Sequence, residues 1–323
     1  MKKAEVTASL GNRFDTRLLI QGKFDLDGYF LRFPDVGEHP WSSFHAMVTS
    51  LPWDIGEQAF SHYMIARDQG VPITAIPVFP SRFFPQLGAV VSSTSGISEP
   101  KELEGKRVGV MGFGYNPAVW MRQILMQHYA VDISKVNWIE DENDKFLGGL
   151  AYPKPAKFHI ESASGFDLLT KAGSNPGPVT ALQEGWIDAF FAPAAGPPLT
   201  AGIQRLFLNP EEEIRNWLSN SGVFPINTLI TLREDTVARY MDLPEKLFKT
   251  MQLAREKYHK SARAKDGDHL GIGREFLTGE QLFPDRYGLE VNRDAIQYMI
   301  DSCYQQGLIR KHYKPEEVFL ALN

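Results

Sequence analysis

The sequence predicts an α/β protein made of two lobes with a ligand-binding cleft between them. Strand-like and helix-like segments alternate through most of the chain, which is the pattern of an α/β fold. The 323 residues are too many for one core of ordinary size and suit two lobes of roughly 100–200 residues each. The third observation is an apolar run at residues 75–79 that stops at Pro80 and is followed by Ser81 and Arg82. A hydroxyl and a guanidinium at one strand end indicate that the cleft binds a small carboxylated molecule.

The elements of the first lobe follow from hydrophobic periodicity and from capping and turn residues. In chain order we expect a strand at residues 5–10, a polar turn at 11–17, a helix at 54–67, and strands at 71–79 and 87–92. Asp54 is the expected N-cap of the helix, because a short carboxylate there accepts backbone N–H bonds.

A second unit is expected to begin near residue 84. Its expected elements are a short helix at 99–105, a buried strand at 106–111, a glycine turn at 112–117, a helix at 118–129, a helical region at 167–185 and a strand at 186–192. Strand, glycine turn and helix start in that order point backbone N–H groups at one place, so we expect an anion beside Gly112 and Gly114. This glycine pair lacks the third glycine and the acidic residue of a dinucleotide fold, so no nucleotide is expected.

The end of the chain returns to the first lobe. A charged helix at 211–218, an extended crossing at 222–230 and helical segments at 242–258 and 292–308 are expected. The predicted lobes are therefore residues 1–83 with 225–323, and residues 84–224.

Composition argues against several classes of protein and partner. The net charge of −5 and the pI of about 5.9 leave no basic stripe for nucleic acid. No apolar run approaches the roughly 18 residues that span a bilayer, so no membrane partner is expected. Cys303 is the only cysteine, which rules out an internal disulfide, and we expect it to be a buried apolar residue.

The chain also lacks the usual signatures of export, metal binding and hydrolysis. The start at Met1 has no apolar signal segment, so a cytoplasmic location is expected if the chain is complete; a mature exported protein would start in the same way. His39 and His45 lie six apart in an expected loop and belong to no metal-binding string. No Gly-x-Ser-x-Gly elbow anchors a hydrolase triad. We therefore expect no metal and no cofactor.

Short motifs spread from residue 54 to residue 308 carry a resemblance to a known family. They are Asp54-Ile-Gly-Glu57 with Phe60-Ser61, Ala75-Ile-Pro-Val-Phe-Pro-Ser-Arg82, Ser95-Gly-Ile97 with Glu99-Pro-Lys101, Gly105-Lys-Arg-Val-Gly109, Ala118-Val-Trp120 with Arg122, Ile187-Asp-Ala189, Phe224-Pro-Ile226, Tyr287-Gly-Leu-Glu290 with Asn292-Arg293, and Gln306-Gly-Leu308. In this order they resemble the 4,5-dihydroxyphthalate decarboxylase family, which is similar in fold to the type II periplasmic solute-binding proteins. The Pro-Val-Phe-Pro-Ser-Arg string is fairly specific, whereas the string at 105–109 is shared with many solute-binding proteins.

The resemblance implies both a fold and an activity. The fold is two-lobed and like that of the type II periplasmic binding proteins, each lobe a mixed sheet flanked by helices, with the cleft between the lobes. The activity is cofactor-independent decarboxylation of a hydroxylated aromatic carboxylic acid such as 4,5-dihydroxyphthalate, in aromatic catabolism. The alternative is a non-catalytic binding protein for a small organic anion, of the type that serves ABC transporters. A biosynthetic enzyme acting on a non-aromatic acid also stays open, as does a homo-oligomeric state.

The chain departs from the family pattern at two places. Asn227 and Thr228 follow the Phe-Pro-Ile segment where the family has a histidine, and Ala192-Pro-Ala-Ala195 stands where the family has an arginine. Both places are expected to lie near the ligand, so the number of carboxylates on the substrate is left open.

Two side chains are candidates for proton transfer. The imidazole of His62 titrates closest to neutral pH; the alternative is a partly buried, hydrogen-bonded histidine. Glu57 is expected in the first turn of the same helix, where the helix dipole stabilises a carboxylate whatever its function. Ser61 and His62 are about 100° apart on a helix, so only one of them is expected to point squarely into the cleft.

The candidates for substrate binding come from both lobes. The planar fork of Arg82 matches a carboxylate with two hydrogen bonds, and the alternative is a structural salt bridge at the lobe junction. Ser81 either adds a donor to the same site or caps a turn. Ser61 is a candidate because it matches the family serine, and Asn227 is a candidate because it stands near the expected ligand, where the family has a histidine.

The other candidates for substrate binding lie in turns and at a helix start. Arg13, Asp15 and Arg17 follow the first strand, where α/β sheets place ligands, or they form a solvated loop. Tyr115 lies in the second-lobe turn, and Trp120 either stacks on an aromatic ring or packs in the core.

Overall fold

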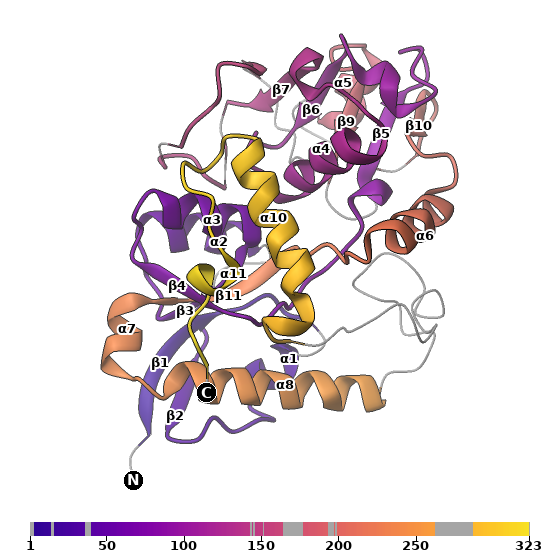
Figure 1. Ribbon diagram of the computed structural model, residues 1–323. Coiled ribbons are helices and arrows are strands. Elements are labelled where there is room, and N and C mark those ends of the chain that lie inside the picture. The colour runs from indigo at the N-terminus through magenta and orange to yellow at the C-terminus, as the bar shows by residue number, and fades with distance from the viewer. Residues whose placement is uncertain are drawn as a thin grey trace.

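Two mixed β-sheets flanked by helices form two lobes in the computed structural model (Figure 1). The structure describes residues 3–13, 16–35, 40–142, 144, 146–150, 152–163, 177–192, 197, 199–261 and 287–322. The predicted α/β class with two helix-flanked sheets is confirmed.

The first sheet has five strands in the order β2-β1-β3-β11-β4. Their bounds are β1 Ala4–Ser9, β2 Tyr29–Arg32, β3 Ile55–Ala59, β4 Ile73–Ile76 and β11 Thr228–Arg233. β1 runs parallel to β2 and β3, while β11 runs antiparallel to β3 and β4. The carboxyl ends of β1, β3 and β4 therefore share one edge of the sheet with the start of β11, where Thr228 pairs with Ala59.

The second sheet has six strands in the order β10-β5-β9-β6-β7-β8. Their bounds are β5 Ala89–Ser92, β6 Arg107–Val110, β7 Asn137–Asp141, β8 His159–Ala163, β9 Ala189–Phe191 and β10 Ile203–Arg205. All strands of this sheet lie between those of β4 and β11 in the chain, so the chain crosses between the sheets twice. The end residues of the lobes given above stay a prediction.

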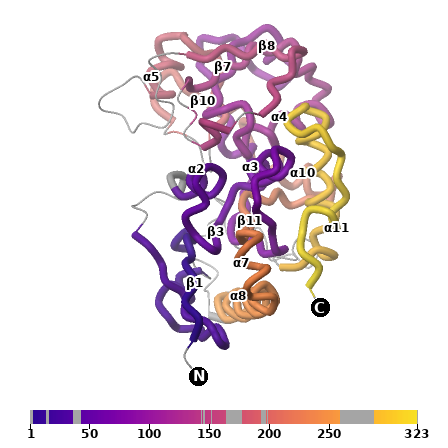
Figure 2. Tube along the Cα trace, turned by 90° about the vertical axis from the view of Figure 1, so that its left-hand side faces the viewer, coloured from indigo at the N-terminus to yellow at the C-terminus, as the bar shows by residue number. Residues whose placement is uncertain are grey.

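Helices cover both sheets and the junction between them. They are α1 Thr16–Ile20, α2 Pro40–Thr49, α3 Phe60–Asp68, α4 Asn116–His128, α5 Pro178–Gln183, α6 Pro210–Ser221, α7 Glu234–Arg239, α8 Leu243–Ser261, α10 Arg293–Gln305 and α11 Pro315–Val318. The helices predicted at 211–218, 242–258 and 292–308 are confirmed as α6, α8 and α10. Helix α10 contacts both α3 and α4, and Figures 1 and 2 show it running along the side of the junction.

The predicted helix at 54–67 is wrong in its first part, because residues Ile55–Ala59 form the central strand β3. Glu57 and Gln58 are polar although β3 is buried along its whole length. Each forms a hydrogen bond with a residue distant in the sequence. The Gln58 amide donates to the Phe44 carbonyl at 2.8 Å. Asp54 caps no helix; its carboxylate accepts from Thr7 and Thr236 instead. The helix begins at Phe60, so Glu57 is not in a helical first turn.

Other differences concern the extent of the elements. β4 is shorter than the predicted strand at 71–79, because Pro77 and Pro80 have no N–H for the ladder. Strands β2, β7, β8 and β10 were not predicted. His45 lies in helix α2 rather than in a loop, and its Nε2 lies 2.6 Å from the Gly148 carbonyl oxygen. His39 and much of the predicted helical region at 167–185 lie outside the described residues.

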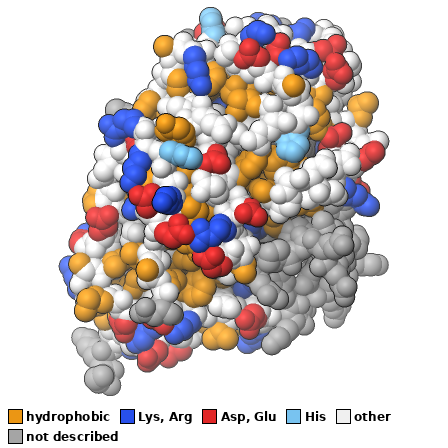
Figure 3. All heavy atoms as spheres, viewed as in Figure 1, with side chains coloured by type: hydrophobic (Ala, Val, Ile, Leu, Met, Phe, Trp, Pro, Cys, Tyr) orange, Lys and Arg blue, Asp and Glu red, His pale blue; other side chains and the backbone are white. Residues whose placement is uncertain are grey.

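The surface and core agree with the composition. Acidic and basic side chains are interspersed over the face shown in Figure 3. Cys303 is fully buried, as predicted. In the described part of the chain, no helix is both long and apolar enough to cross a membrane. The same residues contain no group of three or more His, Cys, Asp or Glu side chains placed to hold a metal ion.

Candidate functional site at the lobe junction

Two chain crossings connect the lobes and run side by side. The first lies between β4 and β5, and the second lies between α6 and β11. Arg82 on the first crossing forms an antiparallel bridge with Ile226 on the second. The Ser81 carbonyl accepts the N–H groups of Asn227 at 2.9 Å and Thr228 at 3.1 Å. These bonds place the serine and arginine predicted to bind the ligand against the second crossing.

The guanidinium of Arg82 points inward at the junction, and the residue is 2 % exposed. Its Nη1 donates to the Phe224 carbonyl at 3.2 Å, and its Nη2 donates to Asn292 Oδ1. The guanidinium carbon also lies 5.3 Å from the centre of the Phe79 ring. Both of these acceptors are neutral groups. The role of Arg82 in substrate binding stays a prediction.

A second buried arginine, which the sequence analysis missed, contacts the same crossing. Arg255 on α8 donates from Nη2 to the Phe79 carbonyl at 3.0 Å and to the Tyr287 hydroxyl at 2.8 Å. Its guanidinium also lies over the Tyr287 ring. Arg255 therefore contacts the first crossing at Phe79, three residues before Arg82.

The imidazole of His62 is buried in the first turn of α3 beside aromatic rings. The ring centres of Phe146 and Tyr115 lie 5.4 Å and 6.5 Å from that of His62. Within the described part of the structure, neither ring nitrogen of His62 has a hydrogen-bond partner. Burial lowers the pKa of His62 to about 3, because the charged form loses its hydration. The imidazole is therefore neutral near pH 7, and both of its nitrogens are buried.

Glu57 on β3 faces the turn that follows β1. Its Oε2 accepts the N–H of Gly11 at 2.8 Å and a hydrogen bond from Arg13 Nη1. Its Oε1 is buried and has no partner among the described residues. The parallel pairing of β1 and β3 brings these groups together at the carboxyl ends of the two strands.

Two of the three charged residues after the first strand are described, and they have different partners. Arg13 pairs with Glu57. Arg17 lies on the exposed side of α1 and donates to Asn12 Oδ1 at 3.1 Å. Asp15 lies outside the described residues.

Ser61 and Asn227 are brought together by a residue that the sequence analysis did not single out. The Ser61 N–H donates to Asn116 Oδ1 at 2.9 Å, and the Ser61 hydroxyl donates to the Gly114 carbonyl at 2.8 Å. Asn116 Nδ2 donates to Asn227 Oδ1 at 3.1 Å. Asn227 Nδ2 in turn lies 3.4 Å from Ser81 Oγ. The Ser61 N–H and the side chains of Asn116, Asn227 and Ser81 thus form one connected network.

The anion expected at the glycine turn before α4 is a side chain of the protein itself. The Phe113 N–H donates to Glu140 Oε2 at 3.0 Å, and the Gly114 N–H donates to the Tyr152 hydroxyl at 3.2 Å. The structure therefore corrects the expectation of a ligand at these N–H groups, because they are already hydrogen-bonded.

Tyr115 and Trp120 occupy different environments. Tyr115 precedes α4 and lies against His62 and Phe146, and burial raises the pKa of its hydroxyl. Trp120 is 1 % exposed; its Nε1 donates to the Ile226 carbonyl at 2.9 Å and its ring stacks on Tyr298 at 5.1 Å. These contacts place Trp120 in the packing of the junction, where its ring covers the second crossing.

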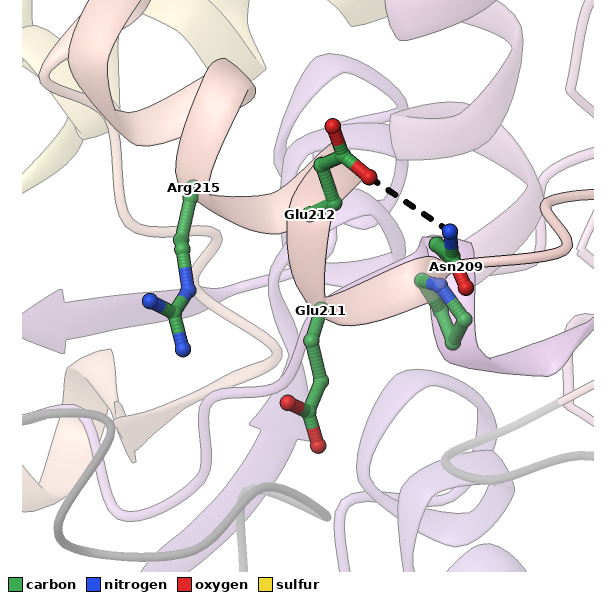
Figure 4. A pocket seen from close by; sticks show the side chains of 5 residues that line it. Asn209, Glu211, Glu212 and Arg215 are labelled. Atoms are coloured by element: carbon green, nitrogen blue, oxygen red, sulfur yellow. Dashed lines mark hydrogen bonds between the residues drawn. The ribbon is translucent and has the colours of Figure 1, made fainter.

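Two hollows lined by described residues lie at α6, away from this network. The larger, of about 430 Å³, is lined by Asn209, Pro210, Glu211, Glu212 and Arg215. Figure 4 shows its charged side chains diverging from the first turns of α6, with Glu212 accepting from Asn209. The smaller, of about 170 Å³, lies between α4 and α6. Neither contains a predicted site residue.

Comparison with known proteins agrees with this architecture. Residues 38–152 match the family model described as NMT1/THI5 like. The periplasmic aliphatic sulphonate-binding protein SsuA of Escherichia coli superposes with a TM-score of 0.53 at 12% identity, over 99% of this chain and 97% of that one. The chain has the periplasmic-binding-protein fold.

Two curated relatives carry the same name. The chain is 26% identical to the 4,5-dihydroxyphthalate decarboxylase of Comamonas testosteroni, over 99% of this chain and 97% of the relative. It is 27% identical to the 4,5-dihydroxyphthalate decarboxylase of Pseudomonas putida, over 67% of this chain and 82% of the relative. The resemblance predicted from the motifs is therefore confirmed.

Proposed function

We propose that the protein is a cofactor-independent decarboxylase that acts on a hydroxylated aromatic carboxylic acid bound at the lobe junction. The similarity to two named decarboxylases supports the reaction class. The observation that carries the proposal is the His62 imidazole, which is buried beside two aromatic rings and has both nitrogens unpartnered among the described residues.

The chemistry requires a proton on the ring carbon that bears the carboxylate. Breaking the bond to the carboxylate directly would leave an electron pair on that carbon. If a hydroxyl ortho or para to it loses its proton, the ring carbon becomes basic enough to take one. Carbon dioxide then leaves, the electrons of the broken bond restore the aromatic ring, and a proton returns to the phenolate oxygen. The sum is one proton consumed and one carbon dioxide released.

Three groups are needed, and the junction offers a candidate for each. The guanidinium of Arg82 with the Ser81 hydroxyl is the candidate clamp for the carboxylate, which would orient the ring. His62 is the candidate for withdrawing the phenolic proton and returning it to carbon. Glu57, with its unpartnered Oε1, is the alternative proton carrier.

The neutral state of His62 suits the first of these steps. A base must be unprotonated when the substrate arrives, and burial lowers the pKa of His62 so that its imidazole is neutral near pH 7. A substrate carboxylate nearby would favour the imidazolium form and raise the pKa of His62, which enables the same ring to act as the acid. The rings of Phe146 and Tyr115 would exclude water and pack on an aromatic substrate.

The test is turnover of a panel of acids. The protein is incubated with 4,5-dihydroxyphthalate and related hydroxybenzoates, while ultraviolet absorbance and carbon dioxide are followed. We expect release of one carbon dioxide per acid consumed, and a loss of about 100-fold or more in the rate for His62→Gln. His128→Gln is the matched control, because this half-exposed histidine stacks edge-on against Trp217 outside the junction.

A second candidate function is a binding protein for a small organic anion. The fold shared with the sulphonate-binding protein SsuA favours it, because that fold serves non-catalytic binding there. Tight binding without turnover across the whole panel would support this candidate and contradict the first.

A further inference from the structure

Asn116 joins three segments of the chain that are far apart in sequence. It is the first residue of α4 in the second sheet's lobe and has no exposed surface. Its Oδ1 accepts the N–H of Ser61, 55 residues away on α3 of the other lobe. Its Nδ2 donates to the Ile226 carbonyl at 3.3 Å and to Asn227 Oδ1 at 3.1 Å on the second crossing. One side chain therefore fastens both lobes to the crossing between them.

The residues held by Asn116 are the neighbours of the candidate catalytic groups. Ser61 immediately precedes His62, so the bond to its N–H fixes the first turn of α3 that carries the imidazole. The Asn227 carbonyl accepts the Phe60 N–H at 3.0 Å, which fixes the same turn from the other side. The Asn227 N–H donates to the Ser81 carbonyl at 2.9 Å, and Ser81 immediately precedes the arginine of the first crossing.

We propose that Asn116 is a positioning residue that sets the distance between His62 and the Arg82 clamp across the lobe junction. The inference rests on the proposed function in that it takes these two residues to contact the substrate. It does not require the substrate to be known, because the bonds of Asn116 are formed within the protein.

The amide is the group that these partners require. Oδ1 must accept from an N–H while Nδ2 donates to two oxygens, and only an amide does both at neutral pH. The site is fully buried, so water cannot replace a lost bond without a rearrangement. Alanine would remove all three contacts.

Aspartate gives a sharper variant because its effect depends on pH. One carboxylate oxygen can still accept from the Ser61 N–H, but the other would face the oxygens of Ile226 and Asn227. Turning the Asn227 amide would let its Nδ2 donate to the carboxylate, with the Ser81 hydroxyl then donating to Asn227 Oδ1, but the Ile226 carbonyl can only accept and would still face the carboxylate. Burial and the facing oxygens raise the pKa of such a carboxyl group. As the pH falls the group protonates and its O–H can donate, so Asn116→Asp should regain the missing bond at low pH.

The experiment compares the parent, Asn116→Ala, Asn116→Asp and the control Asn220→Asp, which lies on the exposed side of α6. Hydrogen exchange is measured for the segment at residues 57–66, and kcat and KM are measured from pH 5.5 to 7.5 where an acid is turned over. We expect kcat of Asn116→Ala to fall about 10–100-fold, with a smaller change in KM, because proton transfer depends on the position of His62. The amides of α3's first turn should exchange about tenfold faster.

The pH profile separates positioning from a merely structural role. The ratio of kcat for Asn116→Asp to kcat for the parent should rise several-fold from pH 7.5 to 5.5, while the ratio for Asn116→Ala stays flat. Unchanged exchange and kcat in Asn116→Ala would overturn the proposal, and so would faster exchange spread evenly over the whole chain with no recovery of Asn116→Asp. If the parent turns over none of the acids, the proposed function fails. Hydrogen exchange alone then decides the role of Asn116: faster exchange confined to the first turn of α3 in both variants, with recovery of Asn116→Asp at low pH, supports it.

Discussion

Acidification should destabilise the protein through His62, by an amount that follows from its burial. The pKa of His62 is lowered from 6.5 to about 3 in the folded protein, so between these values the unfolded chain binds a proton that the folded protein does not. The stabilisation is fully present above pH 6.5 and is lost as the pH falls towards 3. At pH 5.0 the imidazole of the unfolded chain is almost fully protonated, which lowers the free energy of unfolding by about 2 kcal/mol relative to pH 7.5.

Urea denaturation at pH 7.5 and pH 5.0 measures this loss. The parent should lose about 2 kcal/mol more between the two pH values than His62→Gln, because glutamine does not titrate. The measured quantity is the difference between the two proteins in the stability that each loses on acidification. The cavity and hydrogen-bond effects of the substitution cancel in it, and so does the titration of other groups such as Asp54. Asn220→Gln, a substitution between non-titrating side chains on the exposed side of α6, is the control, and it should lose as much as the parent. Equal losses for the parent and His62→Gln would refute the burial argument.

Three further predictions concern Arg82, Glu57 and Tyr298. Arg82→Ala should weaken ligand binding or turnover by about 2–4 kcal/mol, with Arg82→Lys recovering part; titration with the substrate measures this, and two variants that behave like the parent would make Arg82 structural. Glu57→Gln should lower the free energy of unfolding by about 1–3 kcal/mol, because it removes the charge that faces Arg13; an unchanged urea midpoint would argue against that pairing. Tyr298→Ala should cost about 2 kcal/mol by exposing the face of Trp120, whereas Tyr298→Phe keeps the stack; thermal unfolding distinguishes them, and equal melting temperatures would contradict the packing.

The order of strands and helices can be predicted from the sequence where it depends on local signals, namely proline, glycine and hydrophobic periodicity. Helices α4, α6, α8 and α10 follow from such local signals. The strand β3 does not, because Glu57 and Gln58 are tolerated there only through partners more than ten residues away. No local pattern reports such a partner, so the segment resembled a capped helix.

The site was predictable only in part, again because some of its residues act through partners that are distant in the sequence. Ser61 and Ser81 lie in family motifs, Asn227 directly follows one, and the structure brings the three into one network. Asn116 was missed because its role depends on bonds to two distant segments. The available signal was an asparagine directly after the glycine turn, at a helix start followed by proline, and that pattern equally suits a simple cap. Arg255 gave no signal, since a single arginine in an amphipathic helix usually faces solvent.

The lobe junction is proposed to break the bond between an aromatic ring and its carboxylate. The direct measurement uses 4,5-dihydroxyphthalate labelled with carbon-13 in the carboxyl groups and follows labelled carbon dioxide by mass spectrometry. We expect release in proportion to protein concentration, with His62→Gln and Arg82→Ala strongly reduced. Recovery of the labelled acid intact from protein saturated with it would contradict the claim.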